Sequence, residues 1–480
     1  MRSRHEPLLD RSSGRRIIDD AVRLLGDVGV GCEHARTARE LAERAPGVAC
    51  RRGRLLFERD TLRAHIARRR AGHQELAPLE PGAEGAEPPF ALVAPWCSFL
   101  YCDPLTGEVR TPTETEVIDA ARFIDALTIG TGPFGGAIPM YPPGVPPRLA
   151  TLHAERIALL HTARLGGKLT ALDAEEIAFF TAMYKAAGRR YRLALQGMIS
   201  PLRLNPEIME TFFRQDGNPD IDLEISCPIP MLGSTAPASL PAALVQACAE
   251  AIAGDFIFNT LSARGFDALV VRLEPFDMRS GNIVFGSPEW CVFNKAAVDL
   301  ESELRGRPRR YGAFRTNARR VDAQCLIERS SSGLMQALNG VRAFGAVGQL
   351  CVDEVWSPLQ AALDRQILLY MKRVVRGFDG CWEPAADTAA LVREGLQRGS
   401  FLDAESTVAG FRGIYDFEHA FTYGNVASWK AGGMKGLEDA AREEIAATLA
   451  GYSAGATGSR AAEVESIFQD AKRFLSRAGT

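Results

Sequence analysis

The sequence predicts an α/β protein built on a (β/α)8 TIM barrel, with helical N-terminal and C-terminal extensions. Eight short apolar segments between residues 124 and 382 have the composition of strands, and they alternate with segments of helical periodicity. The chain of 480 residues is also long enough for a barrel with additional elements. A doubly wound sheet would give the same alternation, so periodicity alone does not separate the two folds.

The expected organisation has three parts. Residues 1–120 form a helical extension with a short strand pair, residues 121–400 the barrel, and residues 401–480 a helical segment packed on it. Residues 15–75 show helical spacing, and the stretch LAPLEPGAEGAEPP that follows is typical of an exposed loop. The eight expected strands are 124–130, 167–173, 192–200, 221–227, 268–274, 310–314, 344–352 and 378–382, alternating with helices such as 241–264 and 318–341.

Composition narrows the classes of partner and compartment. The net charge is −3 and no long basic run occurs, so nothing favours a nucleic acid partner. The N-terminus is too charged for a secretion signal, and no stretch of about 18 uncharged apolar residues indicates a membrane span. The ten Cys are scattered without a CxxC pair, which favours reduced thiols in the cytoplasm and predicts no metal site.

Charged residues fall on one face of the expected strands. In ALVVRLE, Arg272 and Glu274 alternate with apolar neighbours, and Glu224 does the same in IDLEISC. Because the outer face of a barrel strand packs under helices, these charges should point inward, where burial demands partners. We expect Arg272 to pair with Glu274 or Glu224. An ion-pair network that plugs the barrel and a polar floor for a ligand both fit this pattern.

The stretch DMRSGNIVFGSPEW, residues 277–290, leaves the carboxyl end of the strand that carries Arg272 and Glu274. Loops at that end of a barrel build the sites of barrel enzymes. Gln349 lies beside Gly345 and Gly348, where the backbone leaves room for a ligand. The residues that we expect to bind a ligand at the mouth are Gln196, Glu224, Arg272, Glu274, Phe276, Asp277, Gln349, Trp382 and Glu383.

Several longer stretches resemble one known family. PMLGSTAPASLPAALVQACAEAIAG (230–254), DMRSGNIVFGSPEW (277–290) and RRVDAQCLIERSSSGLMQALNG (319–340) together resemble the trimethylamine methyltransferase family, a corrinoid-dependent group that includes glycine betaine methyltransferases. DPLTGEVRTPTETE (103–116) and GQLCVDEVWSPLQAALDRQIL (348–368) extend the resemblance over nearly the whole chain. The resemblance implies a barrel whose mouth binds a methylated amine. It also implies that a separate corrinoid protein, carrying the cobalamin, accepts the methyl group on Co(I), with Thr316 and Asn317 facing it.

Family members that act on trimethylamine carry pyrrolysine, which this sequence lacks. The chain is therefore similar to the pyrrolysine-free branch, for which small quaternary amines such as betaines are the expected substrates. Displacement at a methyl carbon of a quaternary ammonium releases a neutral amine, so no general acid is required. Aromatic faces and a carboxylate should hold the cation, and Arg272 could receive a betaine carboxylate.

Three departures from the family pattern bear on activity. Ser406 and Gly410 stand where the family has two histidines, and Gly345 stands where it often has a polar residue. The alternative function is a divergent barrel that binds a small ligand or a partner protein without methyl transfer; a reaction on another substrate class is a third reading. Broad helical faces at both termini also favour a homo-oligomer.

Overall fold

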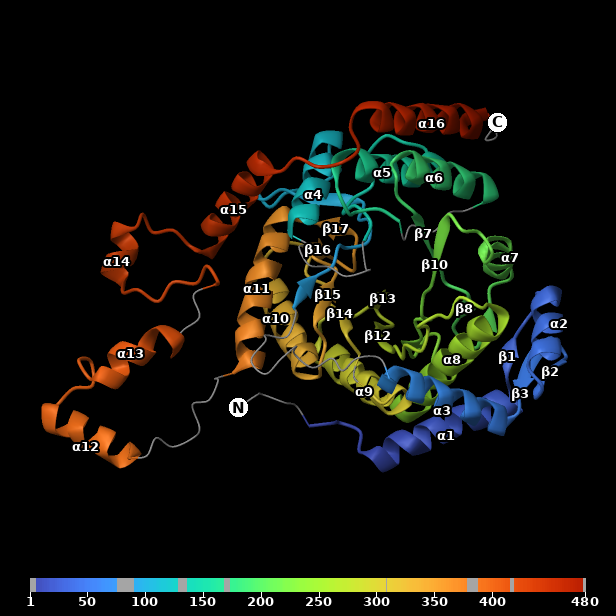
Figure 1. Cartoon of the computed structure of the whole chain (residues 1–480), viewed down its shortest axis with the longest axis horizontal. Coiled ribbons are helices and arrows are strands. Elements are labelled where there is room, and N and C mark those ends of the chain that lie inside the picture. The colour runs from blue at the N-terminus through green and yellow to red at the C-terminus, as the bar shows by residue number, and fades with distance from the viewer. Residues whose placement is uncertain are drawn as a thin grey trace.

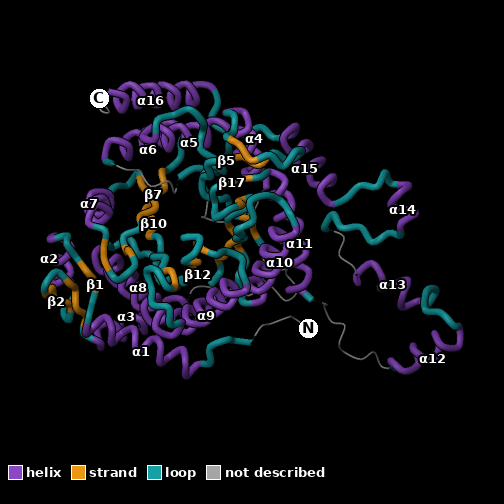
Figure 2. Tube along the Cα trace, turned by 180° about the vertical axis from the view of Figure 1, so that it is seen from behind, coloured by secondary structure: helices purple, strands orange, loops and turns teal. Residues whose placement is uncertain are grey.

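The structure, a computed structural model, describes residues 6–75, 90–127, 136–167, 173–307, 309–377, 387–414 and 418–477. Short strands lie inside a curved layer of helices, and further helices pack against this layer from outside (Figures 1 and 2). The architecture is therefore mixed α/β, as the alternation in the sequence predicts.

Eight successive helices form the curved layer. Local sequence explains where several begin: Ser287, for example, accepts a hydrogen bond from the Trp290 backbone N–H at 3.1 Å, and Pro288 follows it in the first turn. The helices are α4 (Glu114–Leu127), α5 (Pro147–His161), α6 (Ala174–Ala186), α7 (Pro206–Gln215), α8 (Leu240–Leu261), α9 (Pro288–Arg305), α10 (Ala323–Leu338) and α11 (Pro358–Arg376).

Helix α8 is buried around nearly its whole circumference, which explains why its sequence is apolar on all sides. By length and composition it could cross a membrane, but 78% of its most apolar window is buried inside the protein.

The strands inside the layer are mostly parallel. β7 (Tyr191–Leu195) pairs with β10 (Ile221–Ile225), and β15 (Ala343–Gly345) pairs on one side with β14 (Tyr311–Ala313) and on the other with β4 (Ala91–Leu92). β11 (Met231–Leu232) pairs with β12 (Glu274–Asp277), and β5 (Leu100–Cys102) with β17 (Val355–Trp356), again in parallel. The remaining strands in this part are β6 (Val109–Arg110), β8 (Met198–Ile199), β9 (Arg203–Leu204), β13 (Asn282–Ile283) and β16 (Gln349–Leu350). Among the described residues these strands form small sheets, none closed on itself, so a closed barrel stays a prediction.

Backbone contacts also connect segments that carry no strand assignment. The Gly166 N–H donates to the Gly136 carbonyl at 3.0 Å. A Cβ on Gly167 would lie 2.9 Å from that of Arg192, so this segment runs directly beside β7. The inner segments thus lie one after another along much of the inner face of helices α4 to α11. We call these helices and the inner segments together the ring.

The structure corrects part of the expected strand set. Residues 124–127 are the last turn of α4, because Ile124 lies on the same buried helical face as Val117 and Ala121. In the segment 268–274 only Glu274 has a strand assignment. The strand at 91–92, assigned from sequence to the N-terminal extension, instead lies beside β15. Residues 128–130, 168–172 and 378–386, which include most of one expected strand and all of another, lie outside the described residues.

The N-terminal part is not helical throughout, as residues 15–75 were expected to be. A two-residue turn at Arg52 and Gly53, with φ of 51° and 73°, connects two antiparallel strands. Helices α1 and α3 pack against α8 and α9. The elements are α1 (Arg11–Asp27), β1 (Val30–Gly31), α2 (Ala35–Arg44), β2 (Val48–Arg51), β3 (Arg54–Phe57) and α3 (Arg59–Glu75).

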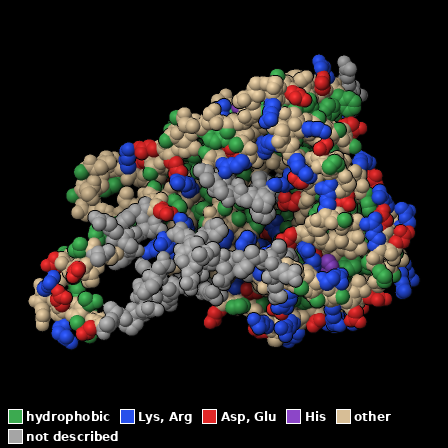
Figure 3. All heavy atoms as spheres, in the orientation of Figure 1, with side chains coloured by type: hydrophobic (Ala, Val, Ile, Leu, Met, Phe, Trp, Pro, Cys, Tyr) green, Lys and Arg blue, Asp and Glu red, His purple; other side chains and the backbone are tan. Residues whose placement is uncertain are grey.

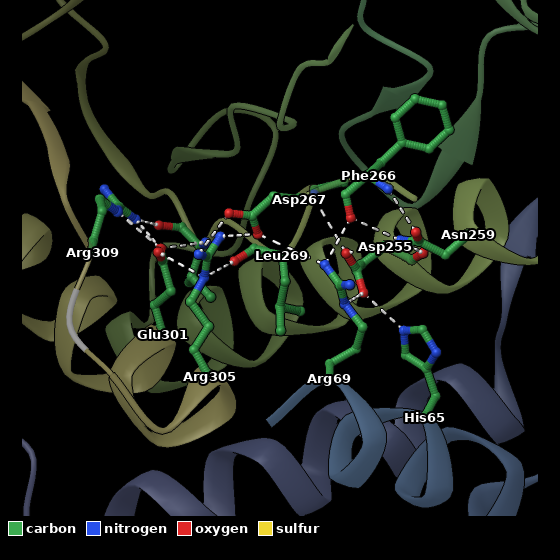
Figure 4. A network of polar contacts seen from close by, with 12 residues as sticks. His65, Arg69, Asp255, Asn259, Phe266, Asp267, Leu269, Glu301, Arg305 and Arg309 are labelled. Atoms are coloured by element: carbon green, nitrogen blue, oxygen red, sulfur yellow. Dashed lines mark hydrogen bonds and ion pairs between the residues drawn. The ribbon is translucent and has the colours of Figure 1, made fainter. Parts of the chain in front are cut away.

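A polar network joins α3 to the ring (Figure 4). Asp255 of α8 is fully buried; its carboxylate hydrogen-bonds to His65 at 2.8 Å and forms an ion pair with Arg69 at 2.9 Å. Farther along, Arg305 of α9 donates to Asp267 at 2.6 Å. Since a buried carboxylate is costly without partners, these contacts fix the N-terminal part on the ring.

After the ring, α15 (Leu437–Gly451) packs against α4 and α11, and α16 (Gly458–Arg477) packs against α5 and α6. Between α11 and α15 the chain projects away from the ring (Figure 1). We call the described residues from 387 to 436 the arm. It contains α12 (Thr388–Arg398), α13 (Glu405–Ile414) and α14 (Val426–Ala431).

Candidate functional site

The predicted inward direction of the charges agrees with the packing. Val271 and Leu273 are buried in the main hydrophobic core together with Leu300 of α9. Since successive side chains of extended backbone point to opposite sides, Arg272 points away from the helices and toward the inside of the ring. The same reasoning applies to Glu224, whose neighbour Ile225 is part of that core.

Arg272 forms an ion pair with Glu274, one of the two partners that the sequence left open. The Arg272 Nε atom lies 3.0 Å from Oε1 of Glu274, and one Nη atom also donates to that oxygen. The other carboxylate oxygen, Oε2, accepts from the indole Nε1 of Trp290 at 2.6 Å. The Arg272 side chain retains 24% exposure, whereas Glu274 and Trp290 are buried. Burial lowers the pKa of Arg272, but Glu274 and Cys227 outweigh it and the net shift is upward.

Tyr311, at the start of β14, lies close to this pair. It keeps 38% exposure, yet burial raises the pKa of its phenol. Arg315 and Arg272 oppose that shift in pKa, while Glu224 and Asp353 add to it. Tyr311, Arg315 and Asp353 were not among the residues expected from sequence. An aromatic residue that opens a short apolar strand looks like an ordinary core position, and no spacing signal distinguishes it.

A second ion pair lies nearby. Arg315 forms it with Asp353, and the guanidinium carbon of Arg315 lies 4.7 Å from the centre of the Phe285 ring. Phe285 in turn meets Trp290 edge-on, with ring centres 6.5 Å apart. Aromatic side chains and paired charges therefore meet where the stretch 277–290 follows the strand; the expectation that this stretch builds a ligand site stays a prediction.

The stretch 277–290 itself is a hairpin followed by the start of α9. Phe276 pairs with Ile283 across the hairpin, and Asp277 with Asn282. The Asp277 carboxylate accepts from the Arg279 backbone N–H at 3.1 Å, which, with Ser280, lowers the Asp277 pKa. Asp277 thus stabilises a turn, and Phe276 is half-buried at its base.

Gln349 is buried, and its amide points toward the segment before β5. Its Nε2 donates to the Trp96 carbonyl at 3.0 Å and lies 3.4 Å from the Ser98 hydroxyl. Within the described residues its Oε1 has no hydrogen-bond partner. The space beside Gly345 that was expected for a ligand is instead filled by Tyr311, whose hydroxyl would lie 2.1 Å from a Cβ at that glycine.

Thr316 and Asn317 hold local structure together. The Thr316 hydroxyl donates to Glu328, and this threonine is almost fully buried. Asn317 accepts from the Phe285 backbone N–H at 2.6 Å and donates to the Ile283 carbonyl at 2.9 Å. Asn317 therefore anchors the hairpin, whereas Thr316 contacts α10; the expectation that both residues face a corrinoid stays a prediction.

The other expected residues are more dispersed. Gln196 is exposed just after β7, and Glu224 is half-buried on β10. Trp382 and Glu383 lie outside the described residues. In the part of the chain that the structure describes, no group of three or more His, Cys, Asp and Glu could hold a metal ion.

The family model described as "Trimethylamine methyltransferase (MTTB)" matches residues 196–466, more than half of the chain. The chain belongs to this family. The match includes Glu224, Arg272, Glu274 and Tyr311.

Relatives of known name agree with this assignment. The trimethylamine methyltransferase MttB of Methanosarcina thermophila is 25% identical over 230 residues, 46% of this chain and 44% of that protein. MttB of Methanosarcina barkeri (strain Fusaro / DSM 804) is 25% identical over 228 residues, 45% of this chain and 43% of that protein. The glycine betaine methyltransferase of Desulfitobacterium hafniense (strain Y51) is 34% identical over 112 residues, 23% of each chain. The matched part thus spans less than half the length of each relative.

Proposed function

We propose that this protein transfers a methyl group from a small quaternary amine, betaine-like in form, to the Co(I) of a separate corrinoid protein. Family membership and the names of the relatives support methyl transfer from an amine. The observation that carries the choice of substrate is the cluster of Arg272, Glu274 and Trp290 on the inner side of the ring.

The cluster suits a zwitterion. A carboxylate of the substrate would approach the Arg272 side chain, which keeps 24% exposure although it is paired with Glu274. The ammonium would lie toward the carboxylates of Glu274 and Glu224 and against the Tyr311 ring. An aromatic face attracts such a cation by roughly 0.5–2 kcal/mol. Without substrate, Arg272 and Glu274 neutralise each other. A zwitterion, which also carries no net charge, can therefore bind beside the pair without leaving a net charge in the site.

The reaction makes few demands on protein side chains. Co(I) supplies the nucleophile, and the carbon–nitrogen bond of one methyl group breaks with its electron pair remaining on nitrogen. The product amine is neutral, so no proton has to be supplied. The protein would orient nitrogen and methyl toward the open end of the ring and exclude water, which can be worth several kcal/mol.

We infer that the inner segments close into a (β/α)8 barrel with its mouth at the carboxyl ends of the strands. Parallel pairing of β4 with β15 and of β7 with β10 supports this, as does the outer layer of helices. Segments that follow those carboxyl ends would form the rim. Two of them expose apolar side chains, with Phe99 at 66% and Met278 at 76%, and this rim is where the corrinoid protein would dock.

We also propose that the protein is a homo-oligomer in the cytoplasm, with the arm as its contact. Arm helices of ten or eleven residues are marginal on their own in water. Their exposed apolar side chains would be more stable when buried, and the same arm of a second copy can bury them one for one. The exposed large apolar residues of the arm are Leu391, Val392, Leu396, Phe401, Leu402, Val408, Phe411, Tyr423, Val426, Trp429 and Met434, and hydrophobic atoms are visible on this projecting part in Figure 3.

The arm exposes eleven large apolar side chains between residues 391 and 434. Burial against a partner copy would remove them from water, and obligate homodimer interfaces, which bury about 2,000 Å² or more, are rich in such side chains.

The test is an absorbance assay. The protein is incubated with Co(I) cobalamin and a panel of quaternary amines that includes glycine betaine and choline, and we expect methylcobalamin with at least one of them. Ligand-dependent thermal stabilisation without methylcobalamin would instead favour the alternative, a ring that binds a ligand but does not transfer methyl. If no compound in the panel either stabilises the protein or yields methylcobalamin, the proposal is contradicted.

A further inference from the structure

Tyr311 and Gly345 occupy neighbouring strands and share one space. A Cβ built on Gly345 would lie 2.1 Å from the Tyr311 hydroxyl and 3.0 Å from its Cζ atom. Side-chain carbons do not approach this closely, so the tyrosine can hold this position only because residue 345 is glycine. Gly345 has an ordinary strand conformation within β15 and is not needed for a left-handed backbone.

Both residues face the inside of the ring. A Cβ on Gly312, the residue after Tyr311, would meet Gln336 of α10 at 2.2 Å, so Gly312 faces the helices and Tyr311 the opposite side. Phe344, the residue before Gly345, is fully buried and stacks on Phe314 with ring centres 5.0 Å apart. Gly345 must therefore also point inward.

The position of the phenol relates it to the proposed site. The Arg309 guanidinium, two residues before Tyr311, donates to the Val271 carbonyl, so the start of β14 lies beside the segment that carries Arg272. Tyr311 as a whole residue keeps 38% exposure, so solvent or a ligand can reach part of it. A large side chain in this place fills the space beside Gly345 and offers an aromatic face.

We propose that Tyr311 determines the size of the ammonium group that the site accepts, and that Gly345 is the gap that lets its ring take this position. The inference rests on the proposed function, because it concerns the same site. It assigns to Tyr311 the role of a wall: the ring contacts a small ammonium group and excludes larger ones. Its hydroxyl takes no part in bond breaking.

The shared space is tested first, without any ligand. In the wild type, Gly345→Ala should lower the unfolding temperature by a few degrees, because the new methyl group collides with the phenol. In a Tyr311→Ala background the same substitution should lower it by clearly less, because the collision is gone. Equal losses in both backgrounds would show that the two residues do not compete for one space.

The size limit is tested by measuring the Kd values of tetramethylammonium and tetraethylammonium chloride by calorimetry. We expect the wild type to prefer the smaller ion, and Tyr311→Ala to shift the ratio of the two Kd values at least tenfold toward the larger one. Tyr311→Phe keeps the ring and should leave the ratio within twofold. Tyr370→Ala, at an exposed tyrosine on the outside of α11, is the matched control and should also leave it unchanged.

The outcomes separate this inference from the proposed function. A folded Tyr311→Ala variant with an unchanged ratio would overturn the size limit while leaving quaternary amine binding intact. Binding of neither ion by the wild type would contradict the proposed substrate class and, with it, the size limit, even if the unfolding experiment showed that Tyr311 and Gly345 compete for space.

Discussion

Trp290 donates its indole hydrogen to Glu274 at 2.6 Å, from the first turn of α9 to the strand that precedes the hairpin. Glu274 receives Arg272 on its other oxygen, so one buried carboxylate connects the inner face of the ring to the helix that follows. The end of the stretch 277–290 thus contacts Glu274, which lies three residues before the stretch begins. This closure explains why a connection of this length carries a tryptophan at its end.

Glu274→Gln should destabilise the protein strongly. The substitution removes the negative charge opposite Arg272, whose guanidinium is mostly buried, and breaking such a pair typically costs about 3–5 kcal/mol, less here because 24% of the arginine remains exposed. Urea unfolding measures the change. The control is Glu289→Gln, at an exposed residue in the first turn of α9, next to Trp290. It should lower the free energy of unfolding by less than about 1 kcal/mol. Equal losses would show that the pair contributes nothing special.

Arg272→Lys should discriminate between substrates. Lysine retains the charge but loses the planar set of donors that binds a carboxylate. We expect the affinity for glycine betaine to fall about tenfold or more, in line with one charge-assisted hydrogen bond of roughly 1.5–3 kcal/mol. Affinity for choline, which has no carboxylate, should change less than threefold. Calorimetry measures both, with Arg279→Lys in the exposed hairpin as control; parallel losses for both ligands would contradict a carboxylate contact.

Negative charges introduced at the rim should impair docking of the corrinoid protein without impairing methyl transfer itself. In a Phe99→Glu and Met278→Glu double variant, both substituted side chains are highly exposed, so folding should be unaffected. Methyl transfer to free Co(I) cobalamin should persist, while transfer to the corrinoid protein should fall at least tenfold because two charges would be desolvated at the contact. Phe474→Glu on α16 is the control. Retained transfer to the corrinoid protein would place the docking surface elsewhere.

The arm predicts a concentration-dependent assembly. The wild type should elute as a dimer or larger species in size-exclusion chromatography with light scattering. A Leu396→Glu and Leu402→Glu variant should shift to the monomer mass, because both leucines are highly exposed in the single chain and would be buried in the assembly. A monomeric wild type at tens of micromolar would contradict this contact.

The sequence predicted a polar contact inside the ring and only part of the strand set. Alternation along 268–274 was enough to predict that Arg272 pairs with Glu274 or Glu224, because a charge on the inner face of a buried strand needs an opposite charge nearby. Residues 124–127 were misassigned because a short apolar run is compatible with a strand and with the buried face of a helix. The place of β4 beside β15 could not be inferred, since it joins segments about 250 residues apart. Gln349 and Asn317 were read as mouth residues from their position, but their amides bind backbone groups that only the folded chain brings near.

The central claim, that a quaternary cation binds inside the ring beside Arg272, Glu274 and Tyr311, is tested most directly by crystals grown with tetramethylarsonium. This ion resembles tetramethylammonium, and its arsenic atom is located without ambiguity by anomalous scattering. We predict one strong anomalous peak on the inner side of β10, β12 and β14, next to the Tyr311 ring. A strong peak elsewhere, or none at a concentration that saturates binding in solution, would contradict the account.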